Sequence, residues 1–330
     1  MKPPPPRGPV SAALLTALRA APHDLPAALA DGFTDGDPLT DEDLQLTLFV
    51  AYELHYRGFD GVDEAWEWQP SLLALRAAAE ARFERALRRL VAPLPQAAPR
   101  DVPRALAALV AADDGPPLAG HLQRRATREQ FREFVMHRSV YHLKEADPHS
   151  WGIPRLGGRA KAALVEIQMD EYGGGQLPDM HAELFATTMR CLQLDATYGA
   201  YVPVAPAVTL ATSNLISLFG LHRRLRGALL GHLAAFEMTS SLPNRRYGNG
   251  LRRLGGDAVA TRFYDEHVAA DAVHEQIAAH DLCGSFAAAE PERAGDVIFG
   301  AACCLALDRL FATHLLTSWQ RGAGSLLVAA

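Results

Sequence analysis

The 330-residue sequence contains only four cysteines, and none are spaced as Cys-x-x-Cys. The closest two, Cys303 and Cys304, are adjacent inside an apolar stretch. This usage is typical of a reduced protein and not of a secreted disulfide framework. The N-terminus combines a proline run with a short apolar patch that arginine interrupts, which is a poor match to a signal peptide. We therefore expect a cytoplasmic protein.

Long runs of one residue character are also missing. No stretch reaches about 18 uninterrupted apolar residues, so we expect no membrane span. The 32 Lys and Arg against 38 Asp and Glu give a net charge of −6 without a long basic run, which argues against nucleic acid as a partner. With 49% hydrophobic and 21% charged residues, the chain can bury a large core and should be globular.

Convincing alternating strands are absent, and apolar residues recur with helical spacing instead. Prolines, acids and glycines stand where helices would begin and end. The sequence predicts an all-α fold with helices near 41–59, 70–91, 103–113, 127–146, 159–172, 178–194, 205–220, 221–241, 257–280 and 291–320. The first 35 or so residues, rich in proline and alanine, are expected to be flexible.

A polar stripe interrupts the predicted helix at 257–280. His267, Asp271 and His274 recur at i, i+4 and i+7, a spacing usually occupied by buried apolar residues. At about 100° per residue, the three side chains lie within ~60° of one another and along ~10 Å of the helix axis. They could bind a metal ion together, although solvated histidines and a surface His–Asp hydrogen bond would give the same pattern.

Glu237 places a second polar group on an apolar stripe. It follows Leu230 and Leu233 by seven and four residues, so it shares their face of a helix. A buried carboxylate must be protonated, paired or bound to a cation. A salt bridge to arginine and a metal ligand are both compatible with this position.

Glu171 and His181 form a third candidate pair. Glu171 stands at the end of one predicted helix and His181 in the first turn of the next, and glycines 173–175 lie between them. A bend at these glycines could bring the two side chains together. Nearby Asp170 is expected to be a simple helix-end charge.

Three helical regions thus offer histidines with carboxylates. Imidazole and hard oxygen donors suit a pair of iron ions, since carboxylates can bridge the ions and offset their charge. A single zinc ion would need only three or four ligands and leave the others unexplained. The Glu-x-x-His motif of ferritin-like bundles does not occur in the sequence, which counts against that scaffold and favours another helical one.

The sequence resembles the haem-oxygenase-like di-iron oxidases, also known as iron-containing redox enzymes. The resemblance rests on His267-x3-Asp271-x2-His274, on Glu171-x9-His181, on Glu237 thirty residues before His267, and on the stretch from LKEADPHSWGIPRLGG to EIQMDEYGGG. It covers about residues 125–320. Its linked spacings are specific, whereas residues 1–124 are similar only to the helical extension of longer members.

The resemblance implies two parts, an N-terminal helical extension (1–124) and a haem-oxygenase-like helical bundle (125–330) that binds two irons. Carried over by position, the implied iron ligands are Glu171, His181, Glu237, His267, Asp271 and His274. Glu145 matches an additional carboxylate position of the family's N-oxygenating members. The resemblance does not decide whether Glu145 or Glu171 is the conditional ligand.

The activity implied by the resemblance is that of a non-haem di-iron oxygenase or oxidase, with O2 as co-substrate and a peroxo-diferric intermediate. The three-carboxylate set favours N-oxygenation of a small amine or amino-acid-like substrate in a biosynthetic pathway. Desaturation, C–C cleavage or decarboxylation of an aliphatic amino or fatty acid is the alternative on the same site. An external electron donor and a homodimer are both compatible with the sequence.

Two further interpretations stay open at the level of sequence. A haem-binding protein of the same fold would need one proximal histidine, but it gives no reason for Asp271 and Glu237. A non-catalytic helical scaffold or metal-binding protein would use the same residues in buried salt bridges.

Overall fold

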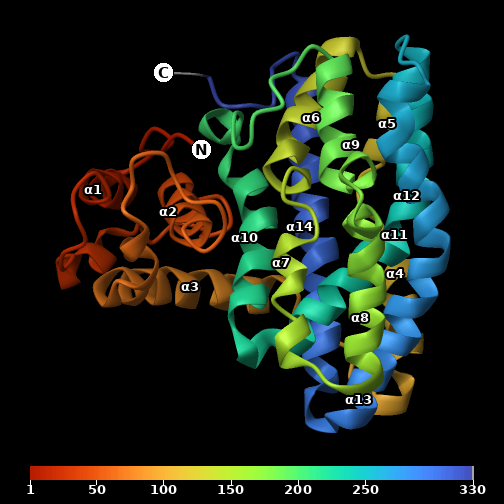
Figure 1. The fold of residues 1–330 in the computed structure, drawn as a ribbon, viewed down its shortest axis with the longest axis horizontal. Coiled ribbons are helices and arrows are strands. Elements are labelled where there is room, and N and C mark those ends of the chain that lie inside the picture. Colours follow the sequence, from red (N-terminus) through yellow and green to blue (C-terminus); the bar gives the residue numbers. More distant parts are fainter. Residues whose placement is uncertain (329–330) are drawn as a thin grey trace.

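The computed structural model describes residues 1–328, except for the side chains of Asp271 and Ala272. Residues 1–328 form helices, turns and loops without a strand, so the prediction of an all-α fold is confirmed. Figure 1 shows an upright bundle of long helices with a smaller N-terminal lobe packed against one side of it.

The N-terminal lobe consists of α1 (Pro9–Ala17), α2 (Glu42–Glu53) and α3 (Pro70–Leu90). The structure differs here from the expected flexible start, because α1 buries Val10 and Leu14 completely. Asp43 at the start of α2 accepts hydrogen bonds from the backbone of Val10 and Ser11 at 2.9 and 2.7 Å. A carboxylate from one helix thus satisfies the free N–H groups at the start of another, which fixes α1 on α2.

The bundle begins with α4 and ends with α14. Its helices are α4 (Val102–Ala111), α5 (Leu118–Arg124), α6 (Arg128–His142), α7 (Asp147–Ser150), α8 (Gly158–Glu171), α9 (His181–Cys191), α10 (Ala207–Leu221), α11 (Arg226–Arg253), α12 (Ala258–Gln276), α13 (Ser285–Ala289) and α14 (Ala294–Gln320). A π-helical segment, η9 (Ile277–Gly284), continues α12. None of the helices described is both long and apolar enough for a membrane span.

The two parts share a continuous core. Leu46 and Phe49 of α2 belong to the same buried cluster as Leu210 and Leu215 of α10, and Figure 1 shows α10 at the side of the bundle that faces the lobe. Helices α4 and α5, which the predicted extension includes, pack against α11 and α14 of the bundle. The division at residue 124 therefore stays a prediction.

Helix α11 is longer than predicted. The sequence suggested an end near residue 241, before Pro243, yet the helix continues through this proline to Arg253. Proline removes one backbone hydrogen bond, which tertiary packing must offset. The packing is close, because a Cβ at Gly250 would overlap the backbone carbonyl of Leu122 in α5.

Helices α11 and α14 cross in direct backbone contact. A Cβ at Gly231 would overlap the carbonyl of Val297, and a Cβ at Gly300 would overlap the carbonyl of Ala228. Glycine at both positions lets the two helix axes approach more closely than larger residues allow.

Candidate metal centre

Six of the predicted ligands converge in the middle of the bundle, although five different segments carry them. Glu145 follows α6, Glu171 ends α8, His181 begins α9, Glu237 lies in α11, and His267 and His274 lie in α12. Each of the six is at most 8% exposed. Buried ionisable groups at this density need partners that offset the cost of removing them from water.

The donor atoms form two groups that share one residue. The first donor group contains Glu145, Glu171, His181 and His267, and the second contains Glu171, Glu237 and His274. Within each group, one ligand atom per residue lies within 4.8 Å of all the others. Glu171 belongs to both, which is the position of a carboxylate that bridges two metal ions.

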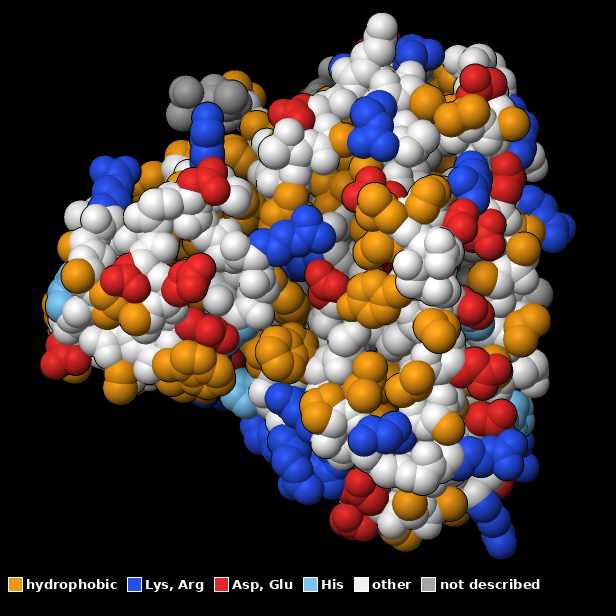
Figure 2. Space-filling model, in the orientation of Figure 1, with side chains coloured by type: hydrophobic (Ala, Val, Ile, Leu, Met, Phe, Trp, Pro, Cys, Tyr) orange, Lys and Arg blue, Asp and Glu red, His pale blue; other side chains and the backbone are white. Residues whose placement is uncertain are grey.

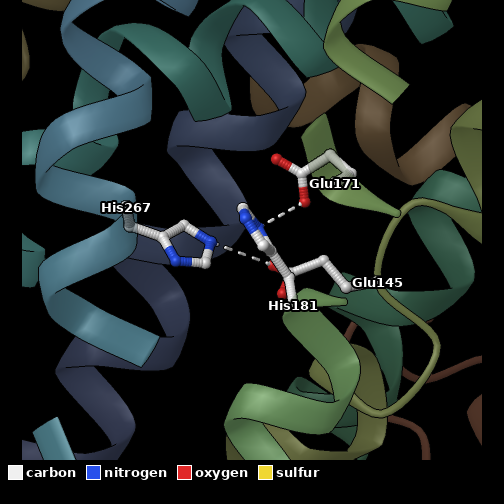
Figure 3. Close-up of side chains that lie close together, drawn as sticks. All are labelled: Glu145, Glu171, His181 and His267. Atoms are coloured by element: carbon white, nitrogen blue, oxygen red, sulfur yellow. Dashed lines mark ion pairs between the residues drawn. The ribbon is translucent and has the colours of Figure 1, made fainter. Parts of the chain in front are cut away.

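The first donor group is compact. His181 Nδ1 lies 2.9 Å from Glu171 Oε2, and His267 Nε2 lies 3.7 Å from Glu145 Oε1. Figure 3 shows the His181 ring pointing toward Glu171 and the His267 ring pointing toward Glu145. The ring centroids of His181 and His267 are 4.4 Å apart, so two imidazoles and two carboxylates face one small space.

The second donor group shares Glu171 with the first. His274 Nδ1 is 3.3 Å from Glu237 Oε2, and His274 Nε2 is 2.9 Å from Asp170 Oδ2. Glu237 is 6% exposed, and its neighbours Leu230 and Leu233 are also buried. The expected burial of this carboxylate on a leucine stripe is therefore confirmed.

One carboxylate oxygen of the first donor group is buried without a hydrogen bond. Within the part of the chain that the structure describes, Glu145 Oε2 has no hydrogen-bond partner. Buried polar atoms are normally satisfied, and a metal ion is one way to satisfy them. His267 Nδ1 lies 2.8 Å from the carbonyl of Phe263, an arrangement that orients Nε2 toward Glu145. The donor set of imidazole and carboxylate fits iron.

The pKa values of His274 and Glu145 reflect the contacts between imidazoles and carboxylates in the two donor groups. Burial alone lowers the pKa of His274, but Glu237 and Asp170 outweigh it and raise this pKa to about 9. Burial raises the pKa of Glu145, but His142 and His267 outweigh it and bring this pKa well below its usual range. These shifts follow from the pairing of buried imidazoles with buried carboxylates.

A cavity of about 490 Å³ connects the two donor groups to the surface. Glu145, Glu171, Glu237 and His267 lie on its wall. The wall also includes the apolar and aromatic side chains of Phe134, Tyr141, Phe185, Leu233, Phe236, Tyr247 and Tyr264. Such a cavity can hold a small molecule beside the donor atoms and restrict access of water.

The family model of iron-containing redox enzymes matches residues 132–309, more than half of the chain. The chain belongs to the iron-containing redox enzyme family. The matched region includes all seven predicted ligands, and the all-helical bundle agrees with the predicted haem-oxygenase-like fold. The family description names iron as the metal, and the residues of the two donor groups are the candidates to bind it.

A curated relative provides a second comparison. Nitrosourea synthase from Streptomyces achromogenes subsp. streptozoticus is 28% identical over 138 residues, which are 41% of this chain and 29% of the relative. The chain thus matches less than a third of that protein's length.

Three glycines explain how Glu171 meets His181 in this family member. Gly173, Gly174 and Gly175 have φ angles of 61°, 59° and 79°, values that strongly favour glycine. They end α8 and form a bend before α9. A Cβ at Gly173 would also overlap the backbone at Asp179. The predicted approach of the two ligands across this bend is confirmed.

Glu145 is held by contacts that the sequence analysis did not identify. His142 Nδ1 lies 2.7 Å from Glu145 Oε1. The next residue, Ala146, has a φ of 74°, which is strained for a residue with a Cβ. Its carbonyl accepts a hydrogen bond from Gln168 Nε2 at 2.8 Å. The spacing of His142 and Glu145, three residues apart, is the signal that could have revealed the first of these contacts.

Asp170 differs from the prediction of a simple helix-end charge, because its carboxylate contacts His274. No sequence spacing indicates this contact, since 104 residues separate the two. Asp271, the remaining predicted ligand, lies outside the residues whose side chains the structure describes. Its role stays a prediction.

Proposed function

We propose that this protein is a non-haem di-iron oxygenase that uses O2 to oxidise a nitrogen of a small amine or amino-acid-derived substrate. The observation that carries this proposal is Glu171, which belongs to both donor groups. A mononuclear site would not require a second set of buried donors that includes the same carboxylate.

The residues divide naturally between two irons. Glu145, His181 and His267 would hold one ion, and Glu237 and His274, with Asp271, would hold the other. Glu171 would bridge them. When bound, the irons supply the electrons and the open coordination positions that O2 activation requires.

The chain's own residues orient these donors and control access to them. The contact between His267 Nδ1 and the Phe263 carbonyl fixes the direction of one imidazole, and Asp170 fixes the direction of His274. Tyr141 and Phe236 on the cavity wall pack their rings 5.5 Å apart beside Glu237. These aromatic side chains help to exclude bulk water and leave room for the substrate.

Two observations favour nitrogen as the oxidised atom. Glu145 adds a third carboxylate to Glu171 and Glu237, and the relative at 28% identity is a nitrosourea synthase. In N-hydroxylation, one atom of O2 enters the N–O bond and the other leaves as water. Two electrons and two protons are consumed in each turnover, so an external electron donor must reduce the irons again.

Anaerobic titration with Fe(II), followed by exposure to O2, tests the proposal. We expect uptake of about two ions per chain and a transient visible absorbance after O2 is admitted. Glu171→Gln should reduce uptake at both positions, whereas Glu166→Gln, an exposed change on the same helix, should leave it unchanged. Absence of iron uptake by the wild type, or unchanged uptake in the Glu171 variant, would contradict the proposal.

A further inference from the structure

Three arginines line the cavity, and two of them are paired with acids. Arg138 contacts Asp308 at 2.7 Å, and Arg309 contacts Asp113 at 2.9 Å. Arg246 also lines the cavity, but it makes neither an ion pair nor a hydrogen bond with any described residue. Its guanidinium is therefore a positive charge on the cavity wall that the protein does not balance locally.

The position of Arg246 relative to the donor groups is set by α11. Arg246 follows Glu237 by nine residues on this helix, which corresponds to ~13 Å along the axis. Thr239, Pro243 and Arg246 lie three or four residues apart, so they form one stripe, and all three line the cavity. The uncompensated charge therefore lies at the end of the cavity away from the second donor group.

The neighbourhood of Arg246 contains a second unused polar group. Tyr264 is 2% exposed and lines the same cavity, and its hydroxyl has no hydrogen-bond partner among the described residues. Its ring packs 5.9 Å from that of Tyr247, the residue next to Arg246. Phe134 packs 4.8 Å from the ring of Tyr247, and Phe185 packs 4.8 Å from the ring of His142, which contacts Glu145. Both phenylalanines line the cavity, so it has polar groups at both ends and aromatic surface along its wall.

We infer that Arg246 binds a carboxylate of the substrate, at the end of the molecule opposite the atom that is oxidised. One unpaired guanidinium matches one carboxylate in charge, and its planar N–H groups can form two parallel hydrogen bonds with the two oxygens. A phosphate dianion would call for a second cation, but Arg138 and Arg309 are already paired. The substrate class is therefore an elongated molecule with a carboxylate at one end.

The assignment of a nitrogen to the other end of this substrate rests on the proposed function. The carboxylate end rests only on Arg246 and its surroundings. The adjacent Arg245 provides a matched control, since it is exposed and is not part of the cavity wall. Both residues are arginines on α11, so substitution of either one by glutamine removes one positive charge from the same helix.

Calorimetric titration of the full-length chain, kept anaerobic with Fe(II), tests the inference. The probes are 6-aminohexanoate, 8-aminooctanoate and 10-aminodecanoate, each compared with the alkylamine of equal length. We expect at least one amino acid to bind about tenfold to a hundredfold more tightly than its amine, because the carboxylate adds charge-assisted hydrogen bonds.

Arg246→Gln should abolish this preference, Arg246→Lys should keep part of it, and Arg245→Gln should leave it unchanged. Thermal unfolding of each variant checks that the fold is retained. The inference is overturned if no amino acid in the series binds more tightly than its amine, or if Arg246→Gln retains the preference.

Iron uptake by the same samples separates this result from the proposed function. A carboxylate preference that depends on Arg246 in a chain that takes up no iron would support the anchor and contradict the di-iron proposal. Normal iron uptake without that preference would contradict the anchor alone.

Discussion

Lys144 Nζ lies 3.1 Å from Glu53 Oε2, and neither side chain is more than 1% exposed. The Tyr198 hydroxyl donates a hydrogen bond to the same carboxylate, and its oxygen lies 2.8 and 2.9 Å from the two carboxylate oxygens. Glu53 belongs to α2 of the N-terminal lobe, and Lys144 directly precedes the predicted ligand Glu145. The lobe therefore contacts the bundle beside the candidate metal centre.

Removal of Lys144 should leave the Glu53 carboxylate buried without a counter-charge. We expect Lys144→Met to lower the free energy of unfolding by about 3–5 kcal/mol, measured by urea denaturation. The double variant Glu53→Gln with Lys144→Met should recover part of this loss, because it removes both charges. A loss below about 1 kcal/mol in the single variant would show that the pair is not desolvated as the structure indicates.

The glycine bend offers a pair of matched substitutions. Gly173→Ala forces a Cβ into the backbone at Asp179, whereas a Cβ at Gly174 would meet nothing within 4 Å. Both positions have positive φ, so each alanine should cost about 1–2 kcal/mol from conformation alone. We expect Gly173→Ala to cost more than this and also to weaken iron uptake. Equal effects of the two substitutions on stability and iron content would contradict the geometry of the bend.

Asp170 should tune the second donor group without being a ligand. We expect Asp170→Asn to weaken iron binding about tenfold to a hundredfold, because it removes the carboxylate that orients His274. Asp179→Asn is the control, since Asp179 also forms an exposed ion pair, with Arg262. Competitive chelation measures both affinities. Similar affinities for the two variants would show that the contact with His274 has no effect on metal binding.

The contact between α11 and α14 predicts opposite effects for two glycine substitutions. Gly231→Ala places a methyl group on the carbonyl of Val297, so it should destabilise the protein by about 1–3 kcal/mol or more. Gly295→Ala in α14 meets no atom within 4 Å and should stabilise the helix by up to about 1 kcal/mol. Thermal unfolding distinguishes the two, and a neutral Gly231→Ala would show that the helices are further apart.

The sequence predicts most helices because their periodicity and their end signals are local. It does not predict α1, whose stability depends on Asp43 from another helix. The sequence also predicts an end of α11 that is too early. The packing that stabilises this helix beyond Pro243 comes from α5, which is distant in the sequence. In these two cases tertiary contacts decide the outcome against local propensity.

The candidate site divides in the same way. Glu171 and His181 can be paired from sequence because the glycines between them indicate a bend. The contact of Asp170 with His274 joins positions 104 residues apart and leaves no periodic signal. Nothing in the sequence distinguishes Arg246 from Arg245, and only the lining of the cavity separates it from this exposed neighbour.

The crossing of α11 and α14 has a consequence for selectivity. No side chain lies between the two backbones at Gly231 and Gly300. Neither helix can therefore shift against the other by rearranging side chains at this contact. Glu237 and Arg246 are both carried by α11, and the spacing between them is therefore set by the main chain. We expect the protein to select its substrates by molecular length. A shift in the preferred length would require a change in the helix itself, for example at Pro243, and not only the exchange of a wall residue.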